Sequence, residues 1–273
     1  MNFALALDRA TRYIWTAIST EYLPMFTRVL IGMWLAIMVP GLVTPAEAGE
    51  VKVAVAANFT EPAREIAAAF ERETGHRVVL SFGASGQFYA QIVQGAPFDV
   101  LVSADKAIPA KAMAEGHAVA GSAFTYATGR LVLFSKTRGV VAAAETLKEA
   151  KFATLAIANP ATAPYGAAAV ETLKALGVLE AVQAKFVLGN NIAQTFQFVD
   201  TGNADLGFVA LSQVARSQEG SRWVVPATLH TPIAQDAVLL KRGAENAAAT
   251  QFLAYLKSPA SRQVIEKFGY GID

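Results

Sequence analysis

Four short segments of this chain carry residues that could bind a small anion. Their sequences are Ala-Asn-Phe-Thr at 57–60, Gly-Ala-Ser-Gly at 83–86, Ala-Pro-Tyr-Gly at 163–166 and Gly-Asn-Asn-Ile at 189–192. Each segment follows a predicted strand or loop and opens a predicted helix, so its backbone N–H groups lie at the positive end of a helix dipole. None contains Lys, Arg, His, Asp or Glu. A site built from them would hold a fully ionised oxyanion through neutral donors, and it would lack the carboxylate acceptor that a protonated phosphate needs.

The first segment also has a simpler interpretation. Asn58 and Thr60 are residue types that cap helices, and Pro62 falls in the first helical turn, where its missing N–H costs little. On this interpretation the two side chains bond only to their own helix. The repetition of the same pattern in four places favours the anion site.

The elements that must position these segments alternate along the chain. Apolar runs at 51–56, 77–82, 98–103, 155–158, 185–188 and 205–210 predict strands, and helical periodicity follows most of them. Such alternation predicts an α/β protein with mostly parallel sheets flanked by helices. The chain is expected to pass between two lobes near 124–134 and to return near 224–231. We therefore expect lobe I at 49–127 plus 229–273 and lobe II at 128–228, joined by two hinge crossovers, with a ligand cleft between them.

The N-terminus is expected to be a targeting segment. Arg28 precedes an apolar run at 29–43, and Ala46-Glu-Ala48 follows it, in the order typical of a secretory signal peptide. The run is shorter than the about 20 residues of a membrane span. We expect residues 1–48 to be removed by cleavage after Ala48, and Met25 is an alternative translation start.

Composition excludes several other kinds of protein. The chain has 273 residues and no cysteine, which rules out disulfides, thiolate metal sites and a cysteine nucleophile. Its net charge of +1, without long basic or acidic runs, favours neither nucleic acid nor a charged membrane surface. The three histidines lie far apart and show no metal-ligand spacing, so no bare metal ion is expected.

Several motifs together resemble the periplasmic molybdate-binding proteins, the substrate-binding subunits of molybdate ABC importers. They are Ala-Ala-Asn-Phe-Thr at 56–60, Ser-Phe-Gly-Ala-Ser at 81–85, Gly-Ala-Pro-Phe-Asp at 95–99, Val-Ser-Ala-Asp at 102–105, Asp-Leu-Gly-Phe-Val at 205–209 and Tyr-Leu-Lys-Ser-Pro at 255–259. The resemblance implies a two-lobed solute-binding fold, similar to type II, without catalysis or cofactor. It also implies a periplasmic monomer that binds molybdate or tungstate and delivers it to the permease subunits of an ABC transporter.

The same resemblance implies which residues bind the oxyanion. Asn58 and Ser85 match polar ligands, whereas Tyr165 and Ile192 match positions that use a backbone N–H group. Neighbouring residues of the same turns are additional candidates: Phe59, Thr60, Gly86 and Ala163. Some members carry a tyrosine hydroxyl where this chain has Ala210, so that donor is absent, and the hydroxyl of Tyr165 is one replacement. Asp99 and Asp105 are expected to bond to local backbone instead of to an anion.

Three alternatives remain at this stage. The sequence does not separate molybdate from tungstate, because the two oxyanions have nearly the same size and charge. A protein of the same fold could instead bind sulfate or another small anion. A serine hydrolase is a remote alternative, since the segment around Ser85 approaches the G-x-S-x-G motif but has Gln87 where the second glycine belongs.

Overall fold

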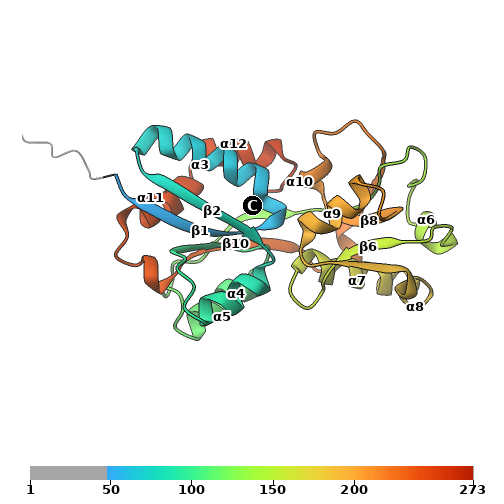
Figure 1. Cartoon of the computed structure of the whole chain (residues 1–273), viewed down its shortest axis with the longest axis horizontal. Helices are drawn as coiled ribbons and strands as arrows, with labels where there is room; N and C mark the ends of the chain where they lie inside the picture. The colour runs from blue at the N-terminus through green and yellow to red at the C-terminus, as the bar shows by residue number, and fades with distance from the viewer. Residues whose placement is uncertain (1–47, 273) are drawn as a thin grey trace, which may run out of the picture. The chain divides into compact units, whose positions relative to one another are not determined.

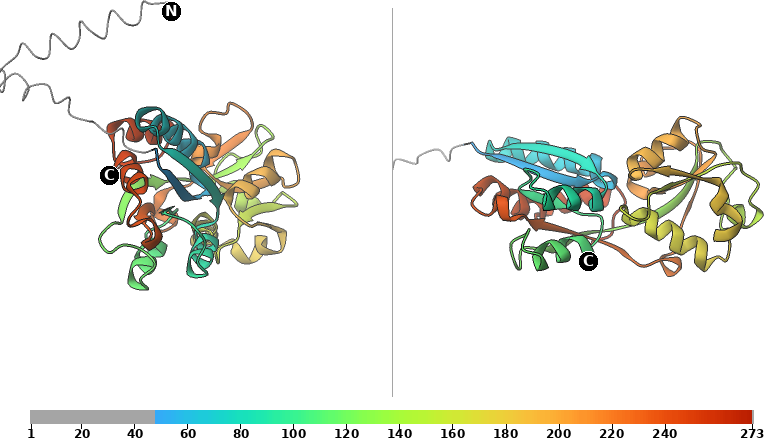
Figure 2. Two further views of the ribbon diagram at one scale, coloured as in Figure 1. Left: turned by 60° about the vertical axis from the view of Figure 1, so that its left-hand side comes forward. Right: turned by 60° about the horizontal axis from the view of Figure 1, so that its bottom comes forward.

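The computed structural model describes residues 48–272. The predicted signal peptide, apart from Ala48, lies outside the described residues. The described chain forms two five-stranded sheets, and Figures 1 and 2 show the elements of the two sheets in two separate groups, the two lobes. Within the described residues no helix is long and apolar enough to cross a membrane.

The first sheet has the strand order β2-β1-β3-β10-β4. Its strands are β1 (Glu50–Ala56), β2 (Arg77–Gly83), β3 (Val100–Val102), β4 (Phe124–Gly129) and β10 (Ile233–Leu239). β1 pairs in parallel with β2 and β3, whereas β10 pairs antiparallel with both β3 and β4. Four strands therefore run one way, and only the strand that returns from the second lobe runs the other way.

Helices cover both faces of the first sheet because its central strand is apolar on both sides. Val51, Val53 and Val55 of β1 pack in one core cluster with α3 (Thr60–Thr74), α11 (Ala247–Leu256) and α12 (Pro259–Lys267). Ala54, between them, packs in a second cluster with α4 (Ser85–Val93) and α5 (Ala107–Ala114). This alternation is the period-two pattern of a buried strand. α3 ends at Gly75, whose φ of 75° requires glycine or strain, and its N–H bonds to the carbonyl of Glu71.

The second sheet repeats this arrangement with the order β7-β6-β8-β5-β9. Its strands are β5 (Leu131–Ser135), β6 (Leu155–Ala158), β7 (Phe186–Gly189), β8 (Leu206–Ala210) and β9 (Ser221–Val224). β5 pairs antiparallel with its neighbours β8 and β9, whereas β6 pairs in parallel with β7 and β8. The prediction of mostly parallel sheets flanked by helices is confirmed for both lobes.

The second sheet is also covered on both faces. Its helices are α6 (Glu145–Glu149), α7 (Pro164–Ala175), α8 (Leu179–Val182), α9 (Ile192–Asp200) and α10 (Leu211–Val214). α7 and α8 pack against the face that carries Leu131 and Leu133, and α9 and α10 pack against the face that carries Val132 and Phe134. Short 3-10 turns complete the chain: η1 (Ala57–Phe59), η2 (Gln183–Lys185), η3 (Ala227–Leu229) and η4 (Lys241–Gly243).

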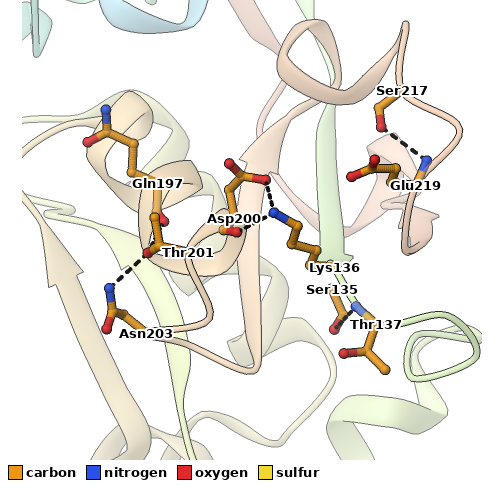
Figure 3. A network of polar contacts seen from close by, with 9 residues as sticks. All are labelled: Ser135, Lys136, Thr137, Gln197, Asp200, Thr201, Asn203, Ser217 and Glu219. Carbon is orange, nitrogen blue, oxygen red and sulfur yellow. Dashed lines mark hydrogen bonds and ion pairs between the residues drawn. The ribbon is translucent and has the colours of Figure 1, made fainter.

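Polar contacts hold the outer end of this second lobe (Figure 3). Lys136, which follows β5, pairs with Asp200 at the end of α9, with a nitrogen–oxygen distance of 3.0 Å. Ser135 at the end of β5 accepts the N–H of Thr137 at 3.3 Å. The ion pair connects the segment after β5 to the end of α9, and the Ser135 contact orders the turn that follows β5.

The chain crosses between the lobes twice. Only Arg130 separates β4 of the first sheet from β5 of the second, so the first crossing is almost one continuous strand. The second crossing leaves β9 at Val224, passes through η3 and enters β10 at Ile233. The sequence predicts that the chain returns to the first lobe near 224–231. In the structure residues 221–224 pair with β5 in the second sheet, and the return begins after them.

Candidate anion-binding site

The four segments identified in the sequence meet at one small cavity between the lobes. Four strands end there, and each is followed by a helix. β1 is followed by η1 and α3, β2 by α4, β6 by α7 and β7 by α9. The cavity has a volume of about 10 Å³, close to the space of a single water-sized sphere. Its lining consists of neutral residues: Ala56, Ala57, Asn58, Gly83, Ala84, Ser85, Ala104, Ala163, Pro164, Tyr165 and Ile192. The structure thus brings together Asn58, Ser85, Tyr165 and Ile192, and Ala163 with them.

Helix geometry leaves backbone donors at this cavity. Ser85 and Ile192 are the first residues of α4 and α9, where an N–H has no acceptor within its own helix. Asn191 caps α9, but its Oδ1 accepts the N–H groups of Ala193 and Gln194, at 3.0 Å each, and not that of Ile192. Tyr165 is the second residue of α7, after Pro164, which has no N–H. The N-termini of three helices therefore lie at one cavity, where their dipoles favour a negative charge.

The hydroxyl of Ser85 is placed to act as a further donor. Its oxygen accepts the backbone N–H of Ala104 at 2.9 Å, and the residue is 1% exposed. A hydroxyl that accepts one hydrogen bond still has its own hydrogen to donate. Ser85 therefore joins two lobe I elements while it offers an O–H donor to the cavity.

The side chain of Asn58 has a different role from the one predicted. It is 3% exposed, and its amide nitrogen donates to Gln235 Oε1 and to Tyr270 Oη, at 2.9 Å each. α3 has no side-chain cap, so the capping interpretation of Asn58 is wrong. Thr60 bonds locally, since its hydroxyl donates to the carbonyl of Ala57 at 2.8 Å. What Asn58 presents to the cavity is consequently its backbone turn more than its amide group.

Three of the additional candidates lie away from the cavity lining. Phe59 is in the lobe I core, where its ring packs edge-on against Tyr126 and Tyr270, with centroids 4.8 and 5.5 Å away. Thr60 lines a separate groove between α3 and α9. Gly86 uses its N–H for the carbonyl of Thr162 in the second lobe, at 3.0 Å.

A buried set of polar side chains, missed in the sequence, lies behind the cavity. We call it the hinge network: Asn58, Tyr126, Tyr165, Gln235 and Tyr270. Gln235 accepts from Tyr126 Oη at 2.8 Å and donates to Tyr165 Oη at 3.2 Å. Burial raises the pKa of all three tyrosines above the usual value for tyrosine, so they are neutral around neutral pH.

The hydroxyl of Tyr165 is therefore engaged at the hinge. It is the acceptor of Gln235 Nε2, and the side chain is 1% exposed. At Ala210, where a tyrosine was noted as missing, the backbone N–H bonds to Gln213 Oε1 at 2.9 Å. The hydroxyl of Tyr165 is thus directed to Gln235 instead of taking the place of that missing donor.

Both aspartates of the lobe I motifs bond to backbone N–H groups, but only Asp105 bonds locally as predicted, because the partner of Asp99 lies 47 residues away on β1. Asp99 Oδ2 accepts the N–H of Lys52 at 2.8 Å, and Asp105 Oδ1 accepts the N–H of Ile108 at 2.9 Å. Burial raises the pKa of the Asp105 carboxyl, although its hydrogen bonds from Ile108 and Ser103 act in the opposite direction. Neither carboxylate lines the cavity.

Direct contacts already hold the two lobes together around the site. Besides the bond between Gly86 and Thr162, the hydroxyl of Ser212 in α10 donates to the carbonyl of Asn58 at 2.8 Å. Small residues of lobe I, including Ala57, Ala84 and Ala104, pack in one apolar cluster with core residues of lobe II. The cleft is therefore nearly closed.

The geometry gives no support to hydrolysis or to a metal centre. Ser85 bonds to a backbone N–H, and no histidine of the described chain lines the cavity. Across residues 48–272 no cluster of three or more His, Cys, Asp or Glu side chains could hold a metal ion.

Comparisons with known proteins agree with this geometry. Residues 51–271 match the family described as bacterial extracellular solute-binding protein. The chain is 54% identical over 233 residues to the molybdate-binding protein ModA of Rhodobacter capsulatus, covering 85% of this chain and 92% of that protein. The molybdate-binding protein ModA of Azotobacter vinelandii is also 54% identical, over 235 residues, covering 85% of this chain and 93% of that protein.

A solved structure of the Azotobacter vinelandii periplasmic molybdate-binding protein superposes with a TM-score of 0.79 at 42% identity, covering 82% of this chain and 99% of that one. The sulfate-binding protein SubI of Mycobacterium tuberculosis superposes with a TM-score of 0.67, covering 81% of this chain and 86% of that one, but at 12% identity this likeness concerns the fold alone. The chain therefore belongs to the bacterial extracellular solute-binding proteins and shares a family with these molybdate-binding relatives.

Proposed function

We propose that the protein captures molybdate outside the cytoplasm and delivers it to the permease subunits of an ABC importer. The observation that carries the proposal is the identity of 54% to two proteins named for molybdate binding, spread over more than nine-tenths of their length. The cavity between the lobes supports it, because four strand-to-helix turns with neutral donors line one small space.

The donors of the cavity suit a dianion. In this proposal the backbone N–H groups of Asn58, Ser85, Tyr165 and Ile192, with the Ser85 hydroxyl, bond to the oxyanion oxygens. Each helix N-terminus adds a favourable interaction of about 0.3–1 kcal/mol with a negative charge. Hydrogen phosphate is disfavoured, because its proton needs an acceptor and no carboxylate lines the cavity.

The site must then distinguish molybdate from other dianions, such as sulfate, by their size and not by their charge. Sulfate carries the same charge as molybdate but is a smaller tetrahedron, so its oxygens reach fewer of the donors at once. Tungstate has nearly the size and charge of molybdate, and we propose that it binds as well. Sulfate as the natural ligand gains no support from the sulfate-binding structure, since that likeness is one of fold.

The two lobes are proposed to act as a clamp. We take lobe I as residues 49–127 plus 229–273 and lobe II as 128–228, a division that the two sheets support except at residues 128 and 129, which belong to β4 of the first sheet. The two crossings would then serve as hinges, and opening would break the interlobe bonds of Gly86 and Asn58. A monomer suffices, because a single chain supplies all of these donors.

Export completes the proposal. The family of extracellular solute-binding proteins supports a periplasmic location. Cleavage of the leader after Ala48 is part of the proposal, and Met25 is an alternative translation start.

A thermal-shift screen with oxyanions tests the function. A ligand that binds only the folded state raises the melting temperature, by an amount that grows with the ratio of its concentration to its Kd. We expect large shifts with molybdate and tungstate, a small shift with sulfate and none with phosphate. Equal shifts with all four anions, or a shift with phosphate alone, would overturn the proposal.

A further inference from the structure

Gln235 is a fully buried side chain that touches both lobes. It lies on β10, the strand that returns from the second lobe, and is 0% exposed. Its oxygen accepts from Asn58, whose turn lines the cavity from lobe I, at 2.9 Å. Its nitrogen donates to Tyr165, whose helix lines the cavity from lobe II, at 3.2 Å. One amide group therefore connects two of the turns that meet at the proposed anion site.

A β-bulge lies next to Gln235, in the pairing of β10 with β4. Gln235 pairs with Ala127 of β4, but the next residue, Asp236, pairs with Thr125, so Tyr126 is left without a partner in the ladder. Bulges of this kind turn side chains out of the regular alternation and are common beside functional sites. Here the extra residue is the one whose hydroxyl donates to Gln235, at 2.8 Å.

The absence of a side chain at Gly129 makes room for the same contact. A Cβ atom there would lie 2.2 Å from Tyr165 Oη and 2.5 Å from Gln235 Nε2, much closer than real Cβ contacts. Gly129 is the last residue of β4, directly before the first crossing. The backbone at the hinge thus passes close to the point where Gln235 and Tyr165 meet.

We propose that Gln235 is a positioning residue of the anion site. It holds the Asn58 turn and the first turn of α7 in the arrangement in which their N–H groups point to one ligand, and it does so from the hinge strand. The inference rests on the proposed function, because the site it positions is the proposed oxyanion site. A buried glutamine that only stabilised lobe I would have no need of a partner in lobe II.

The first test is a double-mutant cycle with Gln235→Met and Tyr165→Phe, read by calorimetric titration with molybdate. Methionine has a similar length and no hydrogen-bonding amide, and phenylalanine removes only the hydroxyl. We expect Gln235→Met to weaken binding at least about tenfold, a change of about 1.4 kcal/mol. Because Tyr165 Oη is held by Gln235, the double variant should bind about as well as Gln235→Met alone. Additive losses, or wild-type affinity in a folded Gln235→Met protein, would contradict the inference.

The second test adds a charge without changing the shape. Gln235→Glu keeps the oxygen that accepts from Asn58, and its carboxyl group would face the hydroxyls of Tyr126 and Tyr165. Tyr270 lies one contact further away, on Asn58. The carboxylates of Asp105 and Asp236 are the other charged groups that act on this network. Burial disfavours the charged form of a carboxyl group and can raise the pKa of a glutamate to about 8–9. We therefore expect the affinity for molybdate to fall in this variant as the pH rises from about 6 to about 9, while that of the wild type stays level.

A structural glutamine would not produce that pH profile. The matched control is Gln251→Glu, the same change on the exposed α11 residue that contacts His76 at 3.1 Å. If Gln235→Met fails to fold, the pH profile of Gln235→Glu decides, and a profile parallel to that of the wild type would overturn the inference. Absence of molybdate binding by the wild type would instead refute the proposed function, so the two failures are distinguishable.

Discussion

Replacing Ser85 by alanine should weaken anion binding and destabilise the protein by two separate effects. The hydroxyl is buried, accepts the N–H of Ala104 at 2.9 Å and faces the cavity. Loss of the acceptor leaves a buried N–H unpaired, at a cost of about 1–3 kcal/mol. For a domain of this size that corresponds to a melting temperature lower by about 2–4 °C for each kcal/mol.

The effect on binding follows from the donor that is lost. A hydrogen bond to a charged group contributes about 1.5–3 kcal/mol, so Ser85→Ala should weaken binding of molybdate by about 10- to 150-fold. Calorimetric titration gives the Kd, and a thermal melt without ligand gives the loss of stability. The two numbers come from different contacts of the same oxygen and should both change.

The control is Ser135→Ala. Ser135 is 2% exposed, accepts the N–H of Thr137 at 3.3 Å and donates to the carbonyl of Asp205 at 2.8 Å (Figure 3 shows the first contact). It lies outside the cavity, so its loss should lower the melting temperature and leave the Kd unchanged. A Ser85→Ala protein that melts at a lower temperature but binds like the wild type would show that Ser85 is only structural.

Three further predictions concern the cleft and the hinge network. Asn58→Asp should weaken molybdate binding by more than tenfold in calorimetry, because a carboxylate cannot donate to Gln235 Oε1 as the amide does and adds a negative charge behind the turn that lines the cavity, and a loss of about 1.4 kcal/mol already costs tenfold; unchanged affinity would refute this placement of the turn. Gly86→Ala should weaken molybdate binding while the stability of the free protein changes little. The reason is that a Cβ atom at this position would lie 3.0 Å from the backbone of Thr162 only when the lobes are closed. Small-angle scattering should then show incomplete compaction with ligand, and full compaction would contradict the prediction. Unfolding at alkaline pH should be steep, because the pKa values of the three network tyrosines are raised above 10.0 in the folded state. Their contribution to the free energy of unfolding is complete below about pH 10 and is lost above it, by up to about 1.4 kcal/mol per pH unit for each tyrosine. A urea midpoint that does not fall above pH 10 would refute this.

The convergence of Asn58, Ser85, Tyr165 and Ile192 was predictable because local rules determine it. Each of these residues follows a short apolar strand and opens a helix, and the carboxyl ends of parallel strands lie at one edge of a sheet. Sequence patterns of a few residues therefore pointed to the four turns, and the resemblance to the molybdate-binding proteins supplied the individual residues that line the same cavity. Whether they bind the oxyanion stays a prediction until it is measured.

Gln235 was missed because nothing in its own neighbourhood marks it. Its partners Tyr165, Tyr126 and Asn58 are 70, 109 and 177 residues away in the sequence, so no local spacing connects them. The available signal was weak: a glutamine next to Asp236 in a mostly apolar strand, opposite a β4 strand that carries a tyrosine. The role of the Asn58 amide was misjudged for the same reason, since it bonds to the distant residues Gln235 and Tyr270.

The short elements of lobe II were also beyond sequence patterns. β9 is an edge strand of four residues, too short for a clear alternation, and α10 is a single helical turn. α10 nevertheless supplies Ser212, whose hydroxyl bonds across the cleft to the carbonyl of Asn58. Only the packing of β8 and β5 decides where these residues lie.

The central claim is that this cleft selects molybdate through neutral donors. The most direct measurement is competitive equilibrium dialysis of the exported protein against equal concentrations of molybdate, sulfate and phosphate, followed by elemental analysis of the bound molybdenum, sulfur and phosphorus after correction for protein sulfur. We expect a single molybdenum atom per chain, with sulfate and phosphate at background. Bound phosphate, or sulfate in the place of molybdenum, would contradict it.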